Sequence, residues 1–108
     1  MSFVNLNTVT ANEIISGFRG KFVHTDNVTV AQWEIEAGAV LADHAHPHEQ
    51  ITMMIEGQFE LTVDGETRVV TAGDVAVIPG HMRHSGKAIT ACRIMDVFHP
   101  ARPEYRNA

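Results

Sequence analysis

The sequence is poor in cysteine and in long apolar runs. Cys92 is its single cysteine, so no disulfide can form within the chain, and stability must come from core packing, a metal or a partner chain. No run of about 18 apolar residues is present to span a membrane. The segment 1–15 also lacks the basic and apolar pattern of a secretory signal, and we therefore expect a cytoplasmic protein.

Positive charge is scarce as well. The chain has 8 Lys and Arg residues against 13 Asp and Glu residues, which gives a formal net charge of -5 at pH 7. This balance argues against a nucleic-acid binder, because the phosphate backbone requires a basic surface. With 108 residues, 44% of them hydrophobic, the chain suits one compact domain over residues 1–108, without repeats or linkers.

Alternating apolar and polar residues predict β-strands. The stretch 28–35 alternates in this way, with apolar residues on much of both faces. The stretch 58–63 alternates too, and it leads through Asp64 and Gly65 into 67–70. Because Asp-Gly is a strong signal for a two-residue turn, we predict a β-hairpin here.

Further strands complete an all-β pattern. Short strands are expected at 74–79 and 88–98, and the regular spacing indicates an antiparallel sandwich or barrel. A weak helical pattern occurs at 10–17, where Asn12 is a possible helix cap. We therefore expect at most a short helical segment near the N-terminus.

The stretch HAHPHEQ, residues 44–50, concentrates polar side chains that bind metals. Residues i and i+2 of a strand point to one face, so His44 and His46 can offer two imidazoles to one ion. Gln50 follows after a short turn, and His84 comes from a distant strand. Because imidazole is a common ligand for divalent transition metals, this spacing predicts a metal site.

Other side chains near this stretch have alternative interpretations. Gln50 is the weakest ligand of the set by chemistry, because a neutral amide oxygen binds late divalent metals less strongly than imidazole or carboxylate does. Glu49 is the alternative, but by alternation it should point away from Gln50. His81 could line the mouth of the site, and its role stays open. Surface or core positions without a ligand role are expected for the remaining histidines, His24, His48 and His99.

The strand near the C-terminus is expected to place a carboxylate in the protein interior. If the apolar residues of 92–98 face inward, alternation puts Asp96 and Phe98 on the same inner face and Arg93 in water. Burial of a lone carboxylate is unfavourable, so it requires a partner, a metal or a raised pKa suited to proton transfer. One hypothesis is that Asp96 is a general base. The alternative is a structural turn cap or ion pair with Arg93 or Arg102.

The strand 51–56 suggests a partner subunit. Thr52 and Met54 are in step with Gln50 and should face the cavity. The opposite face is then apolar and exposed in a small monomer, and it carries Ile51, Met53 and Ile55. A second subunit, or its exchanged N-terminal segment, would cover this face, so we predict a homodimer.

Two motifs along the chain resemble those of the cupin family. The first runs Gly38, five residues, His44-Ala45-His46, three residues, Gln50, six residues and Gly57, with Gln50 where many members have glutamate. The second runs Gly73, five residues, Pro79, four residues and His84, after a short spacer over 58–72. Two positions depart from the pattern, with His81 at a usual glycine and Ala88 at a usual asparagine.

This resemblance implies a cupin jelly-roll barrel, an antiparallel β-sandwich whose mouth holds one divalent transition metal. The ligands that it implies are His44, His46, Gln50 and His84. Three imidazoles and an amide accept most late divalent ions, so Ni, Zn, Mn, Fe and Co are all open.

The ending CRIMDVFHPARPEY is similar to that of small cupins of the pectin degradation family. That family is understood to convert unsaturated uronates from pectin or alginate into linear keto-uronates. The resemblance implies catalytic roles for Asp96, Phe98 and Arg102 and a sugar-acid substrate of open stereochemistry. Two rival functions use the same fold, a cupin dioxygenase acting on an enol or aromatic substrate and a sugar-acid binding protein without activity.

Overall fold

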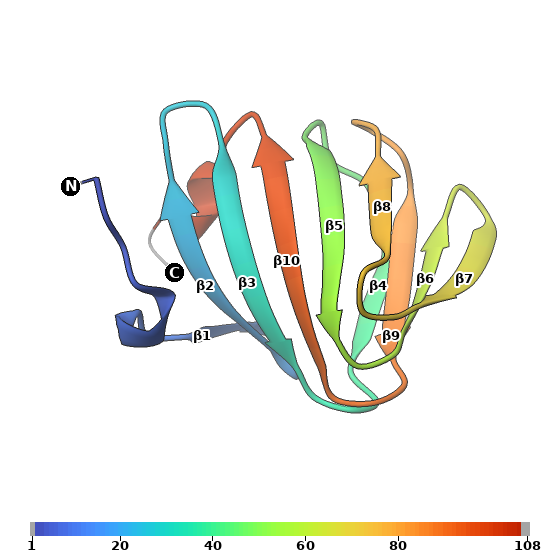
Figure 1. The fold of residues 1–108 in the computed structure, drawn as a ribbon. Helices are drawn as coiled ribbons and strands as arrows, with labels where there is room; N and C mark the ends of the chain where they lie inside the picture. Colours follow the sequence, from blue (N-terminus) through green and yellow to red (C-terminus); the bar gives the residue numbers. More distant parts are fainter. Residues whose placement is uncertain (1, 107–108) are drawn as a thin grey trace.

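The computed structural model describes residues 2–106, which form two antiparallel β-sheets packed as a sandwich (Figure 1). The six-stranded sheet has the order β1 (Asn12–Ile15), β2 (Phe18–His24), β3 (Thr29–Ile35), β10 (Cys92–His99), β5 (Glu49–Glu56) and β8 (Val75–Ile78). The four-stranded sheet has the order β4 (Val40–His44), β9 (His84–Ala88), β6 (Phe59–Val63) and β7 (Glu66–Val70). The predicted all-β sandwich is confirmed.

Helical structure is confined, within the described residues, to two 3₁₀ turns, η1 (Leu6–Thr8) and η2 (Pro103–Tyr105). No helix within residues 2–106 has the length and apolar character needed to cross a membrane.

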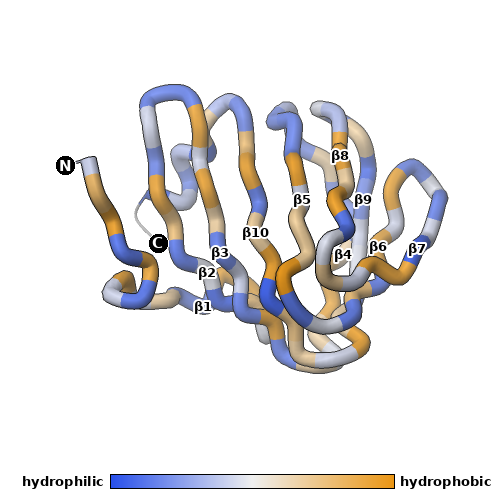
Figure 2. Tube along the Cα trace, viewed as in Figure 1, coloured by the Kyte–Doolittle hydropathy of each residue, from blue (hydrophilic) through white to orange (hydrophobic). Residues whose placement is uncertain are grey.

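Strict alternation of burial explains the core between the sheets. Every second residue of β3 is buried, from Thr29 to Ile35, and β10 alternates in the same way. Figure 2 shows hydrophobic and hydrophilic residues interspersed along the strands rather than segregated into long runs. The inward side chains meet in an aromatic centre, where Phe18 contacts Trp33 and Phe59 edge to face at centroid distances of 6.3 and 6.5 Å.

The predicted hairpin is present between β6 and β7. Asp64 and Gly65 have φ values of 48° and 80°, the left-handed conformation that a two-residue turn of this kind requires. Val63 and Glu66 therefore pair directly on either side of the turn.

Two predictions about local structure were wrong. The stretch 10–17 is not helical, because β1 pairs with β2, Asn12 opposite Gly20, around a turn at Gly17. The expected strand 88–98 is two strands, because the chain turns after Ala88 and β10 begins at Cys92. In that turn the N–H groups of residues 89 and 90 both donate to the carbonyl of Gln58. Sequence reasoning also missed β2.

The outer face of the six-stranded sheet carries a continuous apolar row. Pairs in register join Val23, Val30, Val97, Ile51 and Val77 across five neighbouring strands, and we call these residues the outer row. Ile51 and Val77 are 41% and 71% exposed. The predicted exposure of the apolar face of β5 is confirmed for Ile51 and Ile55, whereas Met53 is half-buried, as are Val23, Val30 and Val97 of the outer row.

We predict that a second copy of the chain covers the outer row. The row is self-complementary under a two-fold axis, and two sheets with similar twist pack well face to face. Light scattering at micromolar concentration should then give about twice the chain mass of 11.9 kDa. Ile51→Glu places a charge in the row and should shift the protein toward the monomer, whereas Thr67→Glu on the other sheet should not. A monomeric unmodified protein contradicts the prediction.

Candidate metal centre

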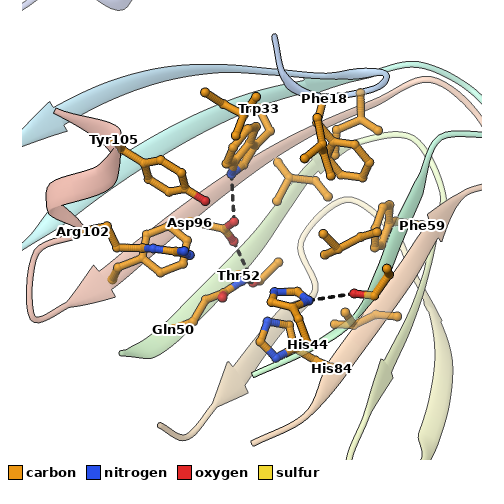
Figure 3. Close-up of a pocket in the computed structure, with 18 residues that line it drawn as sticks. Phe18, Trp33, His44, Gln50, Thr52, Phe59, His84, Asp96, Arg102 and Tyr105 are labelled. Atoms are coloured by element: carbon orange, nitrogen blue, oxygen red, sulfur yellow. Dashed lines mark hydrogen bonds between the residues drawn. The ribbon is translucent and has the colours of Figure 1, made fainter. Parts of the chain in front are cut away.

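Three histidines from two segments of the chain, 44–46 and the start of β9, converge at one end of the sandwich (Figure 3 labels His44 and His84). His44 ends β4, His84 begins β9, and the two strands pair these residues directly. A shift of register between Leu41 and His44 lets β4 turn His44 toward the site. His46 follows in the loop before β5, and its ring lies 5.0 Å from that of His84. One ligand atom from each histidine lies within 4.8 Å of the other two.

The backbone fixes the tautomer of each ring. The Nδ1 atom of every one of these histidines lies at hydrogen-bond distance from a carbonyl two residues away, so Nδ1–H donates to that carbonyl. The carbonyls belong to Ala42, His48 and Met82, at 2.8, 3.0 and 2.9 Å for His44, His46 and His84 in turn. The three Nε2 atoms are thereby left as lone-pair donors, the arrangement typical of metal-ligating histidines.

Burial favours the neutral form of two of these histidines, His46 and His84. Burial first, and then the positive charges of Arg102 and His84, lower the pKa of His46 to about 4. Burial also lowers the pKa of His84. The Nε2 atom of His84 is buried and has no hydrogen-bond partner among the described residues. An orphaned buried acceptor is unfavourable, and a cation at this point would satisfy it.

Gln50 is the second residue of β5, beside this cluster, and its side chain is buried. Its Oε1 atom lies 3.2 Å from Nε2 of His46. His46 donates through Nδ1, so its Nε2 atom and the amide oxygen are two acceptors side by side. Two acceptors at this distance fit a site where both point at one cation. The residues present therefore fit a metal held by three imidazoles and an amide oxygen.

Asp96 lies further inside, on the inner face of β10, as the alternation predicted. Its Oδ1 atom accepts a hydrogen bond from Oγ1 of Thr52 at 2.7 Å, and its Oδ2 atom accepts one from Nε1 of Trp33 at 2.9 Å (Figure 3). Burial raises the pKa of the Asp96 carboxyl to about 6, although these hydrogen bonds lower it. Asp96 makes none of the ion pairs found within residues 2–106, so the alternative of a pair with Arg93 or Arg102 is wrong.

Phe98 and Arg102 form the wall of the site next to the histidine cluster. The Phe98 ring meets that of His46 edge to face at 5.9 Å. The Arg102 guanidinium lies over the rings of Phe98 and Tyr105, at 4.9 and 4.5 Å from their centroids. Its Nε atom donates to Oε1 of Glu104 at 2.6 Å. The guanidinium is thus held in one orientation at the cavity wall.

The segment that carries Arg102 is tied to the hairpin of β2 and β3. The N–H of Arg102 donates to Oγ1 of Thr29 at 2.9 Å. Tyr105, in η2, stacks on Phe22 of β2 with a centroid distance of 4.6 Å. These contacts fix the C-terminal turn over the mouth of the sandwich, beyond the last strand that the residue pattern predicted.

The side chains enclose a cavity of about 350 Å³ with two different ends. The polar end is lined by His44, Gln50, Thr52, His84, Asp96 and Arg102. The inner end is apolar and is lined by residues that include Ile14, Phe18, Ile35, Leu41, Phe59 and Leu61. A ligand here meets fixed polar groups on one side and hydrocarbon on the other.

Four aromatic residues line the cavity without having been predicted to do so. They are Phe18 in β2, Trp33 in β3, Phe59 in β6 and Tyr105 in η2. An aromatic residue in an apolar strand or a terminal turn carries no distinct signal in the sequence, so only the packing of the strands reveals their position.

Three residues near the predicted cluster lie outside it. His81 is exposed at φ 65° and does not line the cavity, but its N–H donates to the carbonyl of His46 at 2.7 Å. His48 is buried with Nδ1 unpartnered among the described residues, outside the three-histidine group. Glu49 is exposed, as expected.

Comparisons with known proteins agree with this geometry. The family described as Cupin domain matches residues 31–98. The pectin degradation protein KdgF of Dickeya dadantii is 25% identical over 96 residues, covering 86% of this chain and 87% of the relative. An RmlC-like cupin from Shewanella frigidimarina superposes with a TM-score of 0.93 at 28% identity, covering 97% of this chain and 96% of the other. KdgF from Halomonas sp. superposes with a TM-score of 0.91 at 29% identity, covering 96% and 97%.

The cluster predicts one tightly held divalent ion per chain. Loss of one imidazole removes a ligand from a closed set, so His84→Ala should lower the metal content measured by plasma mass spectrometry after dialysis to near background. His99→Ala, at an exposed histidine outside the cluster, is the matched control and should keep the metal. Equal metal content in the two variants would show that the ion binds elsewhere.

Proposed function

The chain belongs to the cupin domain family, and from that premise we propose that it linearises 4,5-unsaturated uronates from pectin or alginate breakdown. The observation that carries the proposal is one cavity lined by His44, His84, the buried Asp96 and Arg102, with His46 completing the histidine cluster at its polar end. The similarity to two KdgF proteins, one of them named for pectin degradation, supports it. The product is a linear keto-uronate.

The proposed metal ligands are His44, His46, Gln50 and His84. All four are uncharged, so a bound divalent ion keeps its full positive charge and attracts an anionic sugar acid. When bound, the ion supplies Lewis-acid polarisation of a substrate oxygen.

Arg102 is the proposed carboxylate receptor. Its guanidinium lies over two aromatic rings and is paired through Nε with Glu104, so the Nη atoms can reach a substrate. A planar guanidinium binds a carboxylate in a bidentate manner, and a fixed one loses little freedom on binding. Phe98, beside it, offers an apolar surface to the sugar ring.

Asp96 is the proposed proton carrier. Linearisation takes a proton from the anomeric hydroxyl, breaks the ring C–O bond and adds a proton at the former alkene carbon, so atoms and electrons balance without an oxidant. A carboxylate that accepts hydrogen bonds from Trp33 and Thr52 is fixed in position for both transfers. Burial raises the pKa of this carboxyl to about 6, so it gains and loses a proton at a pH closer to neutral than an exposed aspartate does.

The test uses freshly prepared 4,5-unsaturated galacturonate and its guluronate-derived counterpart, with loss of alkene absorbance as the readout. The protein should accelerate the spontaneous reaction. Asp96→Asn keeps the shape but removes the base, so turnover should fall by about a hundredfold or more. Asp26→Asn, at an exposed aspartate, should retain full activity.

Two results contradict the proposal in different ways. Full activity in Asp96→Asn removes the proposed base and leaves the function. No acceleration by the unmodified protein removes the function, and uronate binding without turnover, measured by calorimetry, identifies a sugar-acid binding protein instead.

A second candidate function is favoured by the apolar inner end of the cavity. Side chains such as Phe18, Leu41 and Phe59 suit an aromatic or enol substrate, as a cupin dioxygenase requires. Such an enzyme consumes oxygen, whereas uronate linearisation does not. We expect no oxygen uptake at an oxygen electrode when the metal-loaded protein receives either uronate, and uptake on an enol or aromatic acid would favour the dioxygenase.

A further inference from the structure

Thr52 stands at the junction between the proposed metal ligand Gln50 and the buried carboxylate of Asp96. Its Oγ1 atom lies 2.7 Å from Oδ1 of Asp96 and 2.9 Å from Nε2 of Gln50. All three side chains are buried, with exposures between 6% and 8%. One hydroxyl therefore connects the two chemically distinct halves of the site, as Figure 3 shows.

The donors and acceptors of this chain allow one arrangement while Asp96 is ionised. A carboxylate only accepts hydrogen bonds, and Nε1 of Trp33 only donates. The single proton of Thr52 must then go to Asp96, so its oxygen is left as an acceptor toward Gln50. The end of the Gln50 amide that faces Thr52 is therefore the NH₂ group.

The opposite end of the amide is thereby fixed as the oxygen. Oε1 of Gln50 points at Nε2 of His46, 3.2 Å away, where the three imidazole lone pairs also meet. If the Gln50 amide were rotated by 180°, its oxygen would face the lone pairs of Thr52, which is repulsive. Its NH₂ group, a donor, would then point at the proposed ion. An NH₂ group cannot ligate a metal, so the orientation decides whether Gln50 is a ligand.

We propose that Thr52 is a positioning residue that holds the amide oxygen of Gln50 toward the metal. Its hydroxyl proton is donated to the Asp96 carboxylate, so its oxygen accepts a hydrogen bond from the NH₂ group of Gln50. The inference rests on the proposed metal site and deepens it. Thr52 is not a ligand in this assignment, and it acts on the ion through Gln50. Its hydroxyl, rather than its bulk, is the required feature.

The experiment measures metal affinity of the purified full chain by competition with a chromophoric chelator, using Zn²⁺ and Ni²⁺ as probes. Thr52→Val removes the hydroxyl at nearly constant shape and should weaken binding by about 10-fold to 100-fold, the usual effect of losing a group that orients a ligand. Thr52→Ser keeps the hydroxyl and should bind as the unmodified chain does. Thr62→Val, at a half-buried threonine of β6 that does not line the cavity, is the matched control.

A second pair of variants separates orientation from general packing. The carboxylate that Gln50→Glu introduces has two equivalent oxygens, so in this background no rotation of the side chain can turn a donor toward the metal. Adding Thr52→Val there should change affinity by no more than about twofold, within the additivity of independent changes. An equal loss in both backgrounds would show that Thr52 acts through packing and would overturn the inference.

The remaining outcomes are also decisive. Weakened binding in Thr52→Ser, or unchanged binding in Thr52→Val, overturns the role of the hydroxyl even if uronate turnover is present. Metal binding with these expected differences but without uronate turnover supports Thr52 as a positioning residue and refutes the proposed reaction. An unmodified chain that binds neither ion overturns both.

Discussion

The hydrogen bond from Thr52 to Asp96 joins β5 to β10 inside the sandwich, and the candidate site depends on it. These residues are direct partners in the register of the two strands, and Phe98 and Gln50 are the next inward pair. Cross-strand neighbours on one face are close enough for their side chains to interact. A shift of either strand by one residue would turn its two side chains to the outer face. The register of one strand pair therefore assembles most of the polar end of the cavity.

The same alternation gives the six-stranded sheet two different faces. Residues in step with Thr52 line the cavity or core, and residues out of step form the outer row. The apolar residues on the two faces of β5 therefore have different roles, because one face lines the cavity or core and the other forms part of the outer row. A surface that excludes water behind the sheet would also stiffen the strands that carry Gln50 and Asp96.

Arg102 links the electrostatics of the two halves of the site. Its positive charge contributes, after burial, to the low pKa of His46, and it also favours the ionised form of Asp96. Neutral imidazole and ionised carboxylate are the forms that the proposed metal and proton chemistry require. Glu104 partly balances this charge at the rim, and the rings of Phe98 and Tyr105 hold the guanidinium without competing for its Nη atoms.

The all-β class, the hairpin at Asp64 and Gly65, and the inward face of β10 follow from residue pattern, because alternation and turn chemistry are local properties. The spacing of the three histidines in the cluster likewise indicated a histidine site from residue pattern alone. Three features emerge from the folded chain and not from the pattern: residues 12–15 form a strand, Asp96 has no basic partner among the described residues, and Trp33, 63 residues away, donates to it. Pairing, burial and hydrogen bonding depend on which distant strands become neighbours, and residue pattern does not specify those contacts.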